Sequence, residues 1–318
     1  MYCGVVSENE KQGKRTMLIT IFTPVYNRAK LLPRLLASLR AQNSKNFEWI
    51  LIDDASIDGS WEYMESIREI KEFSVRIFRQ PHGGKHRAIN KAVDLAEGEY
   101  FFIVDSDDCL RPDAIEKINS WLDDIPVYAN KIAGVAGLCE SFTGKIWGGK
   151  PKCTSDYITC SNLDRAKYNL LGDKAEIYRT DVLRSHKFPD FAGENFVTEA
   201  VCWDAIASDG YVLRWYNEPI YVADYLEDGL TKSGSNSLAG HRNNFQGFCY
   251  YVKQSQRLYS LIRFVPLLWS YHLTCNSIGM PLAERGTHIG ISFEKYLFYL
   301  MLVPFVGVYI KTDRLLRR

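Results

Sequence analysis

The sequence predicts an α/β fold with a mostly parallel central sheet that helices cover on both faces. Four short apolar segments of β-branched and aromatic residues are typical of buried strands, and their centres lie roughly 25–30 residues apart, as in βα units. Helical patterns of apolar residues fill the gaps between these segments. This regular alternation of strands and helices favours parallel strands in one sheet.

The predicted elements follow one another along the chain. The first strands are Leu18–Phe22, Trp49–Ile52, Val75–Phe78 and Tyr100–Val104. Apolar stripes at helical spacing mark helices at 31–39, 61–67 and 88–96, and Pro33 falls in a first turn, where proline is tolerated. Further strands are expected at Ile132–Val135, Ala175–Tyr178, Val212–Tyr216 and Ile220–Val222.

The composition is that of a globular protein. Hydrophobic residues make up 46% and charged residues 24% of the 318 positions, which excludes disordered, collagen-like and polytopic membrane chains. A formal net charge of +1 argues against a nucleic-acid partner, which usually requires a basic excess. Residues 1–16 are polar and lack the apolar core of a secretory signal, so we expect a disordered tail and a cytoplasmic protein. Residues 17–235 form the predicted main domain, and residues 236–318 a helical, partly apolar region.

Polar, charged and glycine residues follow each of the first four strands. These loops read TPVYNR, DDASIDGS, QPHGGK and DSDD, in that order. In α/β sheets of this kind, ligands bind beyond the carboxyl ends of the strands. One such loop alone is most often a solvated turn, but four loops at one sheet edge predict a ligand site.

The run Asp105-Ser106-Asp107-Asp108 is a candidate metal site. Three carboxylates in four residues repel one another unless a cation is present. Mg²⁺ or Mn²⁺, held by one or two carboxylates and by substrate phosphates, would relieve this repulsion. The alternative is that Asp107 or Asp108 caps the helix that follows.

Two other loops supply groups suited to a nucleotide. Asp53 or Asp54, after the second strand, is suited to a ribose hydroxyl or a base edge, although a turn explains each residue equally well. Gly83-Gly84-Lys85 precedes a helix, where backbone amides and the lysine suit a phosphate. The loop is not a Walker A motif, because the GxxxxGK[ST] spacing is absent. A GxGxxG motif is also absent, which argues against dinucleotide redox chemistry.

In this order and spacing, the motifs resemble the inverting family 2 glycosyltransferases, which have the GT-A fold. The matching segments are Thr23–Arg28, Ile52–Ser60, Gly83–Lys85 with Asn90, and Gly98–Asp108, with a looser match over Gly172–Ser233. The resemblance implies sugar transfer from a nucleotide-diphosphate donor, with Mn²⁺ or Mg²⁺ on the diphosphate. It also implies residue roles: Pro24, Tyr26, Arg28, Asp53 and Asp54 around the nucleoside, Lys85 and Asn90 near the donor, Asp105 near the ribose, and Asp107 as the metal ligand.

Family members usually carry their general base in a pair of acids at the start of a helix. The nearest match is Thr198-Glu199-Ala200, in which Ala200 replaces the second acid. The resemblance therefore indicates Glu199 as the base and Asp204 as the second candidate. The alternative is that Glu199 only caps a helix. More loosely, Gly172–Lys174 resembles an acceptor-facing segment, and Asp228–Ser233 resembles a loop that closes over the diphosphate.

The end of the chain is helical and apolar. Tyr296–Ile310 has no charged residue, but it is short for a bilayer span and contains Pro304 and Gly307. Basic residues follow it, so an interfacial helix at the inner face of the plasma membrane fits the pattern. A packed helical extension or a dimer contact is the alternative.

We therefore expect an inverting glycosyltransferase that moves a hexose-type sugar, preferably from a UDP-sugar, to a hydroxyl of a saccharide or lipid-linked acceptor in cell-envelope or surface polysaccharide synthesis. One competing hypothesis is a nucleotidyltransferase, which would need a glycine-rich basic loop after the first strand. The other is a carbohydrate- or nucleotide-binding module without catalysis, which Ala200 leaves open. The sequence does not decide the oligomeric state.

Overall fold

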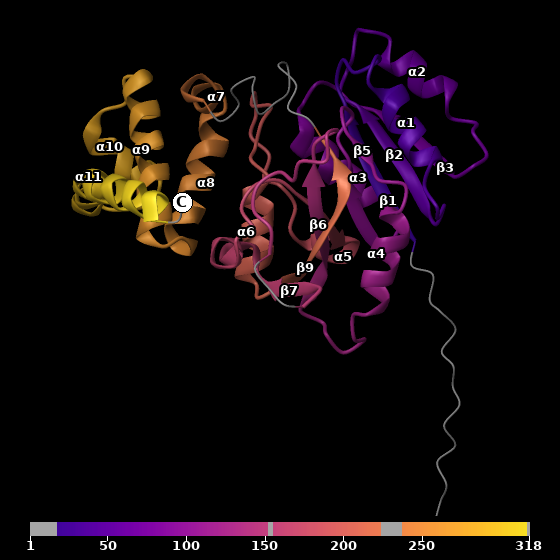
Figure 1. Cartoon of the computed structure of the whole chain (residues 1–318). Coiled ribbons are helices and arrows are strands. Elements are labelled where there is room, and N and C mark those ends of the chain that lie inside the picture. Colours follow the sequence, from indigo (N-terminus) through magenta and orange to yellow (C-terminus); the bar gives the residue numbers. More distant parts are fainter. Residues whose placement is uncertain (1–17, 152–154, 224–236, 317–318) are drawn as a thin grey trace, which may run out of the picture.

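The computed structural model describes residues 18–151, 155–223 and 237–316, so the expected tail at 1–16 and the expected loop at 228–233 lie outside the described residues. The strands are β1 (Ile19–Val25), β2 (Phe47–Asp53), β3 (Ser74–Arg79), β4 (Tyr100–Ile103), β5 (Cys109–Leu110), β6 (Ile132–Glu140), β7 (Tyr157–Cys160), β8 (Lys174–Arg179) and β9 (Val212–Val222). In this described part they form one nine-stranded sheet, in the order β3-β2-β1-β4-β8-β6-β9-β5, with β7 paired to β9 (Figure 1).

The first part of the sheet confirms the predicted strands and their direction. β2 and β4 both pair in parallel with β1, and β3 pairs in parallel with β2. The carboxyl ends of these strands therefore meet at one edge, and the polar loops that follow them are neighbours. The later strands include antiparallel pairs of β8 with β4 and β6, so the whole sheet is mixed rather than mostly parallel.

One strand prediction was wrong. The segments Val212–Tyr216 and Ile220–Val222 belong to a single strand, β9, which continues through Asn217-Glu218-Pro219. The register between β6 and β9 shifts around Leu138, which pairs with Pro219. Such irregularities accommodate a proline that would otherwise interrupt a sheet ladder.

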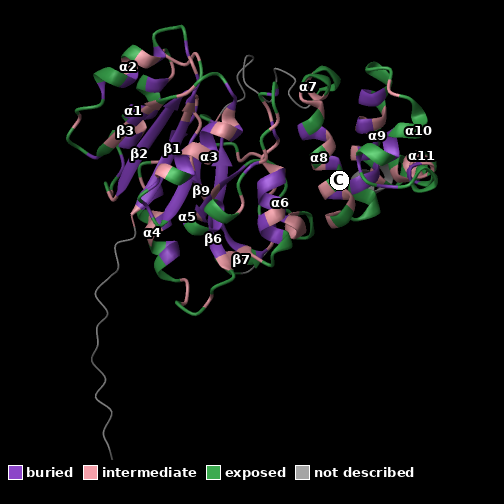
Figure 2. Ribbon diagram, turned by 180° about the vertical axis from the view of Figure 1, so that it is seen from behind, coloured by how far each residue is buried: buried purple, intermediate pink, exposed green. Residues whose placement is uncertain are grey.

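Helices cover both faces of the sheet, as predicted. One core cluster packs the sheet against α1 (Leu32–Arg40), α2 (Ser60–Ser66) and α4 (Ala114–Asp123). The other packs it against α3 (Lys85–Leu95), α5 (Thr180–Ser185) and α6 (Ala200–Ser208). The predicted leucine stripe of α1 is buried, and Pro33 lies in its first turn. Figure 2 shows the buried residues following the strands of the sheet.

A helical region follows the sheet and lies beside α6 (Figure 1). Its helices are α7 (Leu238–Asn243), α8 (Phe245–Leu258), α9 (Leu261–Ser277), α10 (Leu282–His288) and α11 (Phe293–Leu316). The buried Glu194 carboxylate accepts hydrogen bonds from the backbone amides of Gln246 and Gly247 in the first turn of α8. The amide of Gln254 donates to the carbonyl oxygen of Val201 in α6. These contacts attach the helical region to the sheet domain.

The C-terminal apolar helix is longer than expected. α11 begins at Phe293 and continues through Pro304 and Gly307. Phe293–Ile310 is long and apolar enough to cross a membrane by length and composition, and only 11% of this window is buried. Tyr296 and Tyr299 pack into the core of the helical region, whereas many other apolar side chains of α11 are exposed.

Candidate active site

A cavity of about 1750 Å³ lies at the sheet edge where the loops after β1, β2, β3 and β4 meet. Most of the residues that the sequence analysis selected line it, namely Pro24, Tyr26, Arg28, Asp54, Lys85, Asp105, Asp107 and Glu199. Asp53, Asn90 and Asp204 are not among the described residues that line it. The cavity also takes in residues from the 3-10 helix η1 (Asn162–Tyr168), from α6 and from the helical region.

One end of the cavity presents an aromatic pair above a buried carboxylate. The rings of Tyr26 and His82 lie 4.5 Å apart, and Tyr26 is 46% exposed. Asp54 accepts hydrogen bonds from the backbone amides of Gly83 and Gly84 at 2.9 and 2.8 Å, and its Oδ2 lies 3.0 Å from Nδ1 of His82. Asp54 therefore orders the glycine loop beneath the pair. His82 belongs to a loop that the sequence analysis identified, but its ring was not singled out.

Asp53 and Asn90 have structural partners instead of facing the cavity. Asp53 is fully buried, 2.9 Å from Nε of Arg79, and accepts from the amide of Ser56. Asn90 donates to the carbonyl oxygen of Phe188 and accepts from its amide, so it ties α3 to the segment before α6. Neither side chain lines the cavity in the described residues, so contact of Asp53 or Asn90 with a donor stays a prediction.

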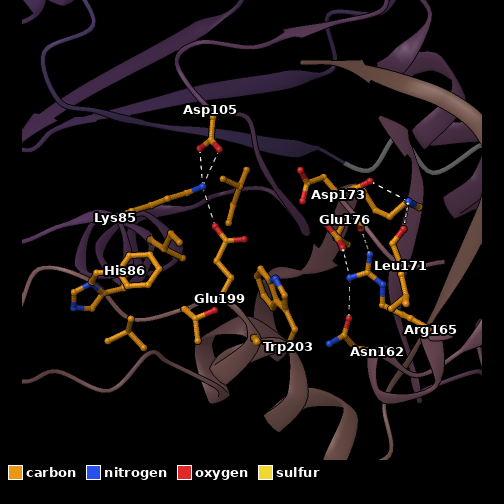
Figure 3. A pocket seen from close by; sticks show the side chains of 18 of the residues that line it. Lys85, His86, Asp105, Asn162, Arg165, Leu171, Asp173, Glu176, Glu199 and Trp203 are labelled. Atoms are coloured by element: carbon orange, nitrogen blue, oxygen red, sulfur yellow. Dashed lines mark hydrogen bonds and ion pairs between the residues drawn. The ribbon is translucent and has the colours of Figure 1, made fainter. Parts of the chain in front are cut away.

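Lys85 joins two carboxylates at the centre of the cavity (Figure 3). Its Nζ lies 2.7 Å from Oδ1 of Asp105 and 2.8 Å from Oε1 of Glu199. Burial by itself lowers the pKa of Lys85, but the charges of Asp105 and Glu199 outweigh it and raise this pKa. Gly84 permits the arrangement, because it has φ +87° and a side chain there would collide with the carbonyl of Asn195. The start of α3 can thus lie against the segment that leads to Glu199.

The acidic loop after β4 brings three carboxyl groups close together, and only Asp105 among them has Lys85 as an ion-pair partner in the described residues. Burial and the neighbours Asp105 and Asp107 raise the pKa of Asp108 to about 8, and the hydroxyl of Tyr221 donates to it at 2.7 Å. Burial and Asp105 also raise the pKa of Asp107. Helix α4 begins only at Ala114, with Asp113 at its N-cap, so the interpretation of Asp107 or Asp108 as that cap was wrong.

These acids fit a divalent cation that also binds substrate oxygens. No group of three or more His, Cys, Asp or Glu side chains arranged to hold a metal occurs among the described residues. A cation here would therefore need phosphate oxygens to complete its coordination, as Mg²⁺ commonly does. The raised pKa values of Asp107 and Asp108 indicate a site that a positive charge would stabilise.

The wall beyond Glu199 contains a second charged cluster that sequence reasoning missed. Arg165 Nη1 lies 3.3 Å from Oε1 of Glu176. Burial raises the pKa of Glu176 to about 7, while Arg165 opposes this shift and Glu199 adds to it. Trp203, stacked on Tyr178 at 4.6 Å, lies between Glu199 and this cluster (Figure 3). In the sequence, only the expected acceptor-facing segment Gly172–Lys174 indicated this part of the cavity. Its residues do line the cavity.

The second candidate for the base, Asp204, has a different environment. It is 1% exposed and accepts hydrogen bonds from Asn162 at 2.8 Å and from the Tyr259 hydroxyl at 2.5 Å. Asp204 therefore joins η1 to the helical region. Of the two candidates, only Glu199 faces the cavity.

The architecture described above is the GT-A fold of glycosyltransferases. Solved structures share the fold. TarS of Staphylococcus aureus, residues 1–349 in complex with UDP-GlcNAc, superimposes with a TM-score of 0.56 at 17% identity, over 93% of this chain and 92% of that one. The mannosyltransferase PcManGT of Pyrobaculum calidifontis, in complex with GDP-Man and Mn²⁺, gives a TM-score of 0.50 at 18% identity, over 94% and 79%.

The sequence comparison points to the same family. Residues 20–142 match the model of glycosyl transferase family 2. The glycosyltransferase GlyG of Streptococcus pneumoniae is 36% identical over 102 residues, which cover 32% of this chain and 34% of GlyG. The chain thus spans about a third of the length of this relative. The resemblance to family 2 and the GT-A fold expected from the sequence are confirmed.

Proposed function

We propose that this protein is an inverting, metal-dependent glycosyltransferase that moves a sugar from a nucleotide-diphosphate donor to an acceptor hydroxyl. The observation that carries the proposal is the meeting of Lys85, Asp105 and Glu199 inside the cavity at the sheet edge. A cation and a carboxylate at one reaction centre supply the two elements that glycosyl transfer needs. These are stabilisation of a departing diphosphate and removal of a proton from the attacking hydroxyl.

The donor would lie with its base at the Tyr26–His82 pair. Flat aromatic faces stack on nucleobases, and Asp54 holds the loop that supports this end. Pro24, Arg28 and Asp105 line the same region and would surround the nucleoside, with Asp53 supporting from behind through Arg79. We favour a UDP-sugar because the TarS structure with the same fold holds UDP-GlcNAc.

Mn²⁺ or Mg²⁺ is the cofactor that the acidic loop would hold, with Asp107 as its ligand. When bound, such an ion neutralises charge on the departing diphosphate. Lys85 supplies a second positive charge nearby, and its side chain is long enough to exchange a carboxylate for a phosphate oxygen. The PcManGT structure, which contains GDP-Man and Mn²⁺, supports this assignment.

Glu199 is the proposed general base. The acceptor oxygen forms a bond to the anomeric carbon, the bond from that carbon to the diphosphate oxygen breaks, and the acceptor proton passes to the Glu199 carboxylate. Because attack comes from the face opposite the leaving group, the anomeric configuration inverts. The position of Glu199 at the start of α6, 41% exposed in the cavity, leaves it accessible to an acceptor.

The exposed apolar side chains of α11 support peripheral attachment to a membrane, at its cytoplasmic face. Several of them are more than half exposed, with Phe305 at 72%, Val308 at 65% and Met301 at 64%. Apolar helix faces of this kind insert shallowly at the lipid–water interface. The chain is also similar to a putative teichuronic acid biosynthesis glycosyltransferase of Bacillus subtilis and to a poly(ribitol-phosphate) beta-N-acetylglucosaminyltransferase of Staphylococcus aureus, which favours a role in cell-envelope or surface polysaccharide synthesis.

UDP release from UDP-GlcNAc tests the proposal. We expect slow release in the presence of Mn²⁺ and none after chelation with EDTA. A binding module without catalysis would bind the nucleotide and release no UDP. A nucleotidyltransferase would instead form pyrophosphate from UTP and a sugar phosphate. Either of these results would replace the proposed function.

A further inference from the structure

The cavity extends past the reaction centre to the helical region. Its far end is lined by Arg257, Leu258, Tyr259, Ile262 and Arg263 at the junction of α8 and α9, and by Tyr309 of α11. They belong to the helical region, which lies on the side of α6 away from β1, β2 and β3 (Figure 1). An acceptor approaching Glu199 from this side would therefore contact both the sheet domain and the helical region.

This end of the cavity is held in a fixed position by one buried carboxylate. Asp204 accepts from Tyr259 of the helical region and from Asn162 of η1. Arg263 stacks on the Tyr259 ring at 3.6 Å and donates to its hydroxyl at 2.8 Å. Asp204 thus holds η1 and the junction of α8 and α9 together, so this end of the cavity is formed before a ligand binds.

Two guanidinium groups mark this end as a site for an anion. Arg257 is exposed, and within the described ranges its side chain has no hydrogen-bond or ion-pair partner. Arg263 lies 3.9 Å from Asp204 and retains donors that Tyr259 does not use. Planar guanidinium groups bind phosphate oxygens in pairs of parallel hydrogen bonds. A phosphate group is therefore one anion that this chemistry suits.

An apolar surface continues from the same place. Ile262 and Tyr309 line the cavity and are also 43% and 51% exposed. Next to them, Leu261 of α9 is 49% exposed and Phe305 of α11 is 72% exposed. A ligand whose phosphate binds at Arg257 would therefore have the reaction centre on one side of the phosphate and the exposed apolar side chains on the other.

We propose that Arg257 and Arg263, with the exposed apolar side chains of α9 and α11, bind an acceptor in which a saccharide is linked through phosphate to a long apolar chain. The inference rests on the proposed function, because it assigns the acceptor of that same reaction. The saccharide hydroxyl would face Glu199, the phosphate would lie at the two arginines, and the chain would remain in the membrane on which α11 lies.

Vesicle binding tests this assignment without turnover. The probe is a polyprenyl monophosphate in phosphatidylcholine vesicles, compared with the corresponding polyprenol and with phosphatidylglycerol vesicles of equal charge. We expect the full chain to bind the polyprenyl phosphate vesicles at least about tenfold more tightly than either comparison, the effect of one or two charge-assisted hydrogen bonds. Equal binding to polyprenol vesicles would overturn the phosphate site. Equal binding to phosphatidylglycerol would show a general anionic-membrane contact instead.

Arg257→Gln is the variant and Lys253→Gln, one turn earlier on α8, is its matched control. Lys253 is exposed and does not line the cavity in the described residues. Arg257→Gln should remove most of the tenfold preference, and Lys253→Gln should keep it, with unchanged thermal unfolding in both. An unaltered preference in Arg257→Gln would contradict the assignment. Absence of UDP release from the wild-type protein would instead contradict the proposed function, whatever the vesicles show.

Discussion

The Nζ atom of Lys85 lies 2.8 Å from Oε1 of Glu199, so the proposed base forms an ion pair with the proposed diphosphate-binding cation. The same Nζ contacts Asp105 at 2.7 Å. A donor diphosphate would compete with both carboxylates for Lys85, and its binding would release Glu199 toward the acceptor. The two residues therefore have separable roles, which substitutions can distinguish.

Glu199→Gln keeps the size of the side chain and removes its basicity. Loss of a general base typically lowers the rate by about 10²–10⁴. We expect UDP release to fall by this factor. The donor Kd from titration should not rise, because the base acts on the face opposite the leaving group and the amide competes less with the diphosphate for Lys85. Asp204→Asn is the control and should leave turnover much less affected. If Asp204→Asn abolishes turnover and Glu199→Gln spares it, the roles are reversed.

Lys85→Met should affect donor binding as well as turnover. The substitution removes a cation suited to the diphosphate and leaves Asp105 and Glu199 without their shared partner. A charged hydrogen bond contributes about 1.5–3 kcal/mol, so the donor Kd should rise at least about tenfold. Lys91→Met on the same helix, whose Nζ donates to the carbonyl of Arg79, is the matched control. A donor Kd unchanged by Lys85→Met would exclude Lys85 from the diphosphate site.

Asp107→Asn tests the metal site. The amide removes one anionic ligand and one charge that would offset the cation. We expect loss of turnover and of Mn²⁺-dependent donor binding, measured by calorimetric titration with and without Mn²⁺, while thermal unfolding is unchanged. Near-normal turnover in this variant would show that the metal binds elsewhere or is not used.

Much of the sheet and part of the site could be predicted because their signals are local. The pattern of apolar residues predicted strands β1 to β4, and the loops after them contain the glycine and acidic motifs. The Arg165–Glu176 pair and the Tyr26–His82 pair depend on contacts between distant segments, which no local pattern records. Asn90 matched a motif, yet its side chain is satisfied by Phe188. The continuity of β9 through Pro219 depends on the shifted register with β6.

Glu176 predicts a dependence of stability on pH. Burial raises its pKa from 4.5 to about 7 in the folded protein. Between these values the folded state holds a proton that the unfolded state has released, so the free energy of unfolding falls as pH rises, by up to about 3 kcal/mol. Urea unfolding from pH 4.5 to 8 should show this fall in the wild type and a smaller one in Glu176→Gln. Glu69→Gln, at a site 83% exposed, should behave as the wild type. An identical fall in Glu176→Gln would assign the effect to other groups.

The outer face of α11 predicts membrane attachment that point substitutions can remove. Truncation at Tyr296 is a poor test, because Tyr296 and Tyr299 pack in the core of the helical region. Met301 and Phe305 are 64% and 72% exposed, so Met301→Ser with Phe305→Ser should leave the fold intact. Burying one apolar side chain in lipid contributes about 1.5–3 kcal/mol to the free energy of binding. The double variant should therefore bind phosphatidylcholine vesicles at least about tenfold more weakly.

The matched control for this face is Val127→Ser, at an apolar side chain that is 88% exposed on the sheet domain. It should bind vesicles as the wild type does. If the double variant also binds like the wild type, α11 does not contact lipid. If the wild type is instead a dimer in size-exclusion chromatography without lipid and the double variant is a monomer, the exposed face of α11 joins two copies of the chain, and the membrane assignment is wrong. The exposed positions of Met301 and Phe305 predict a different result. The wild type should be a monomer that binds vesicles, and the double variant should lose this binding.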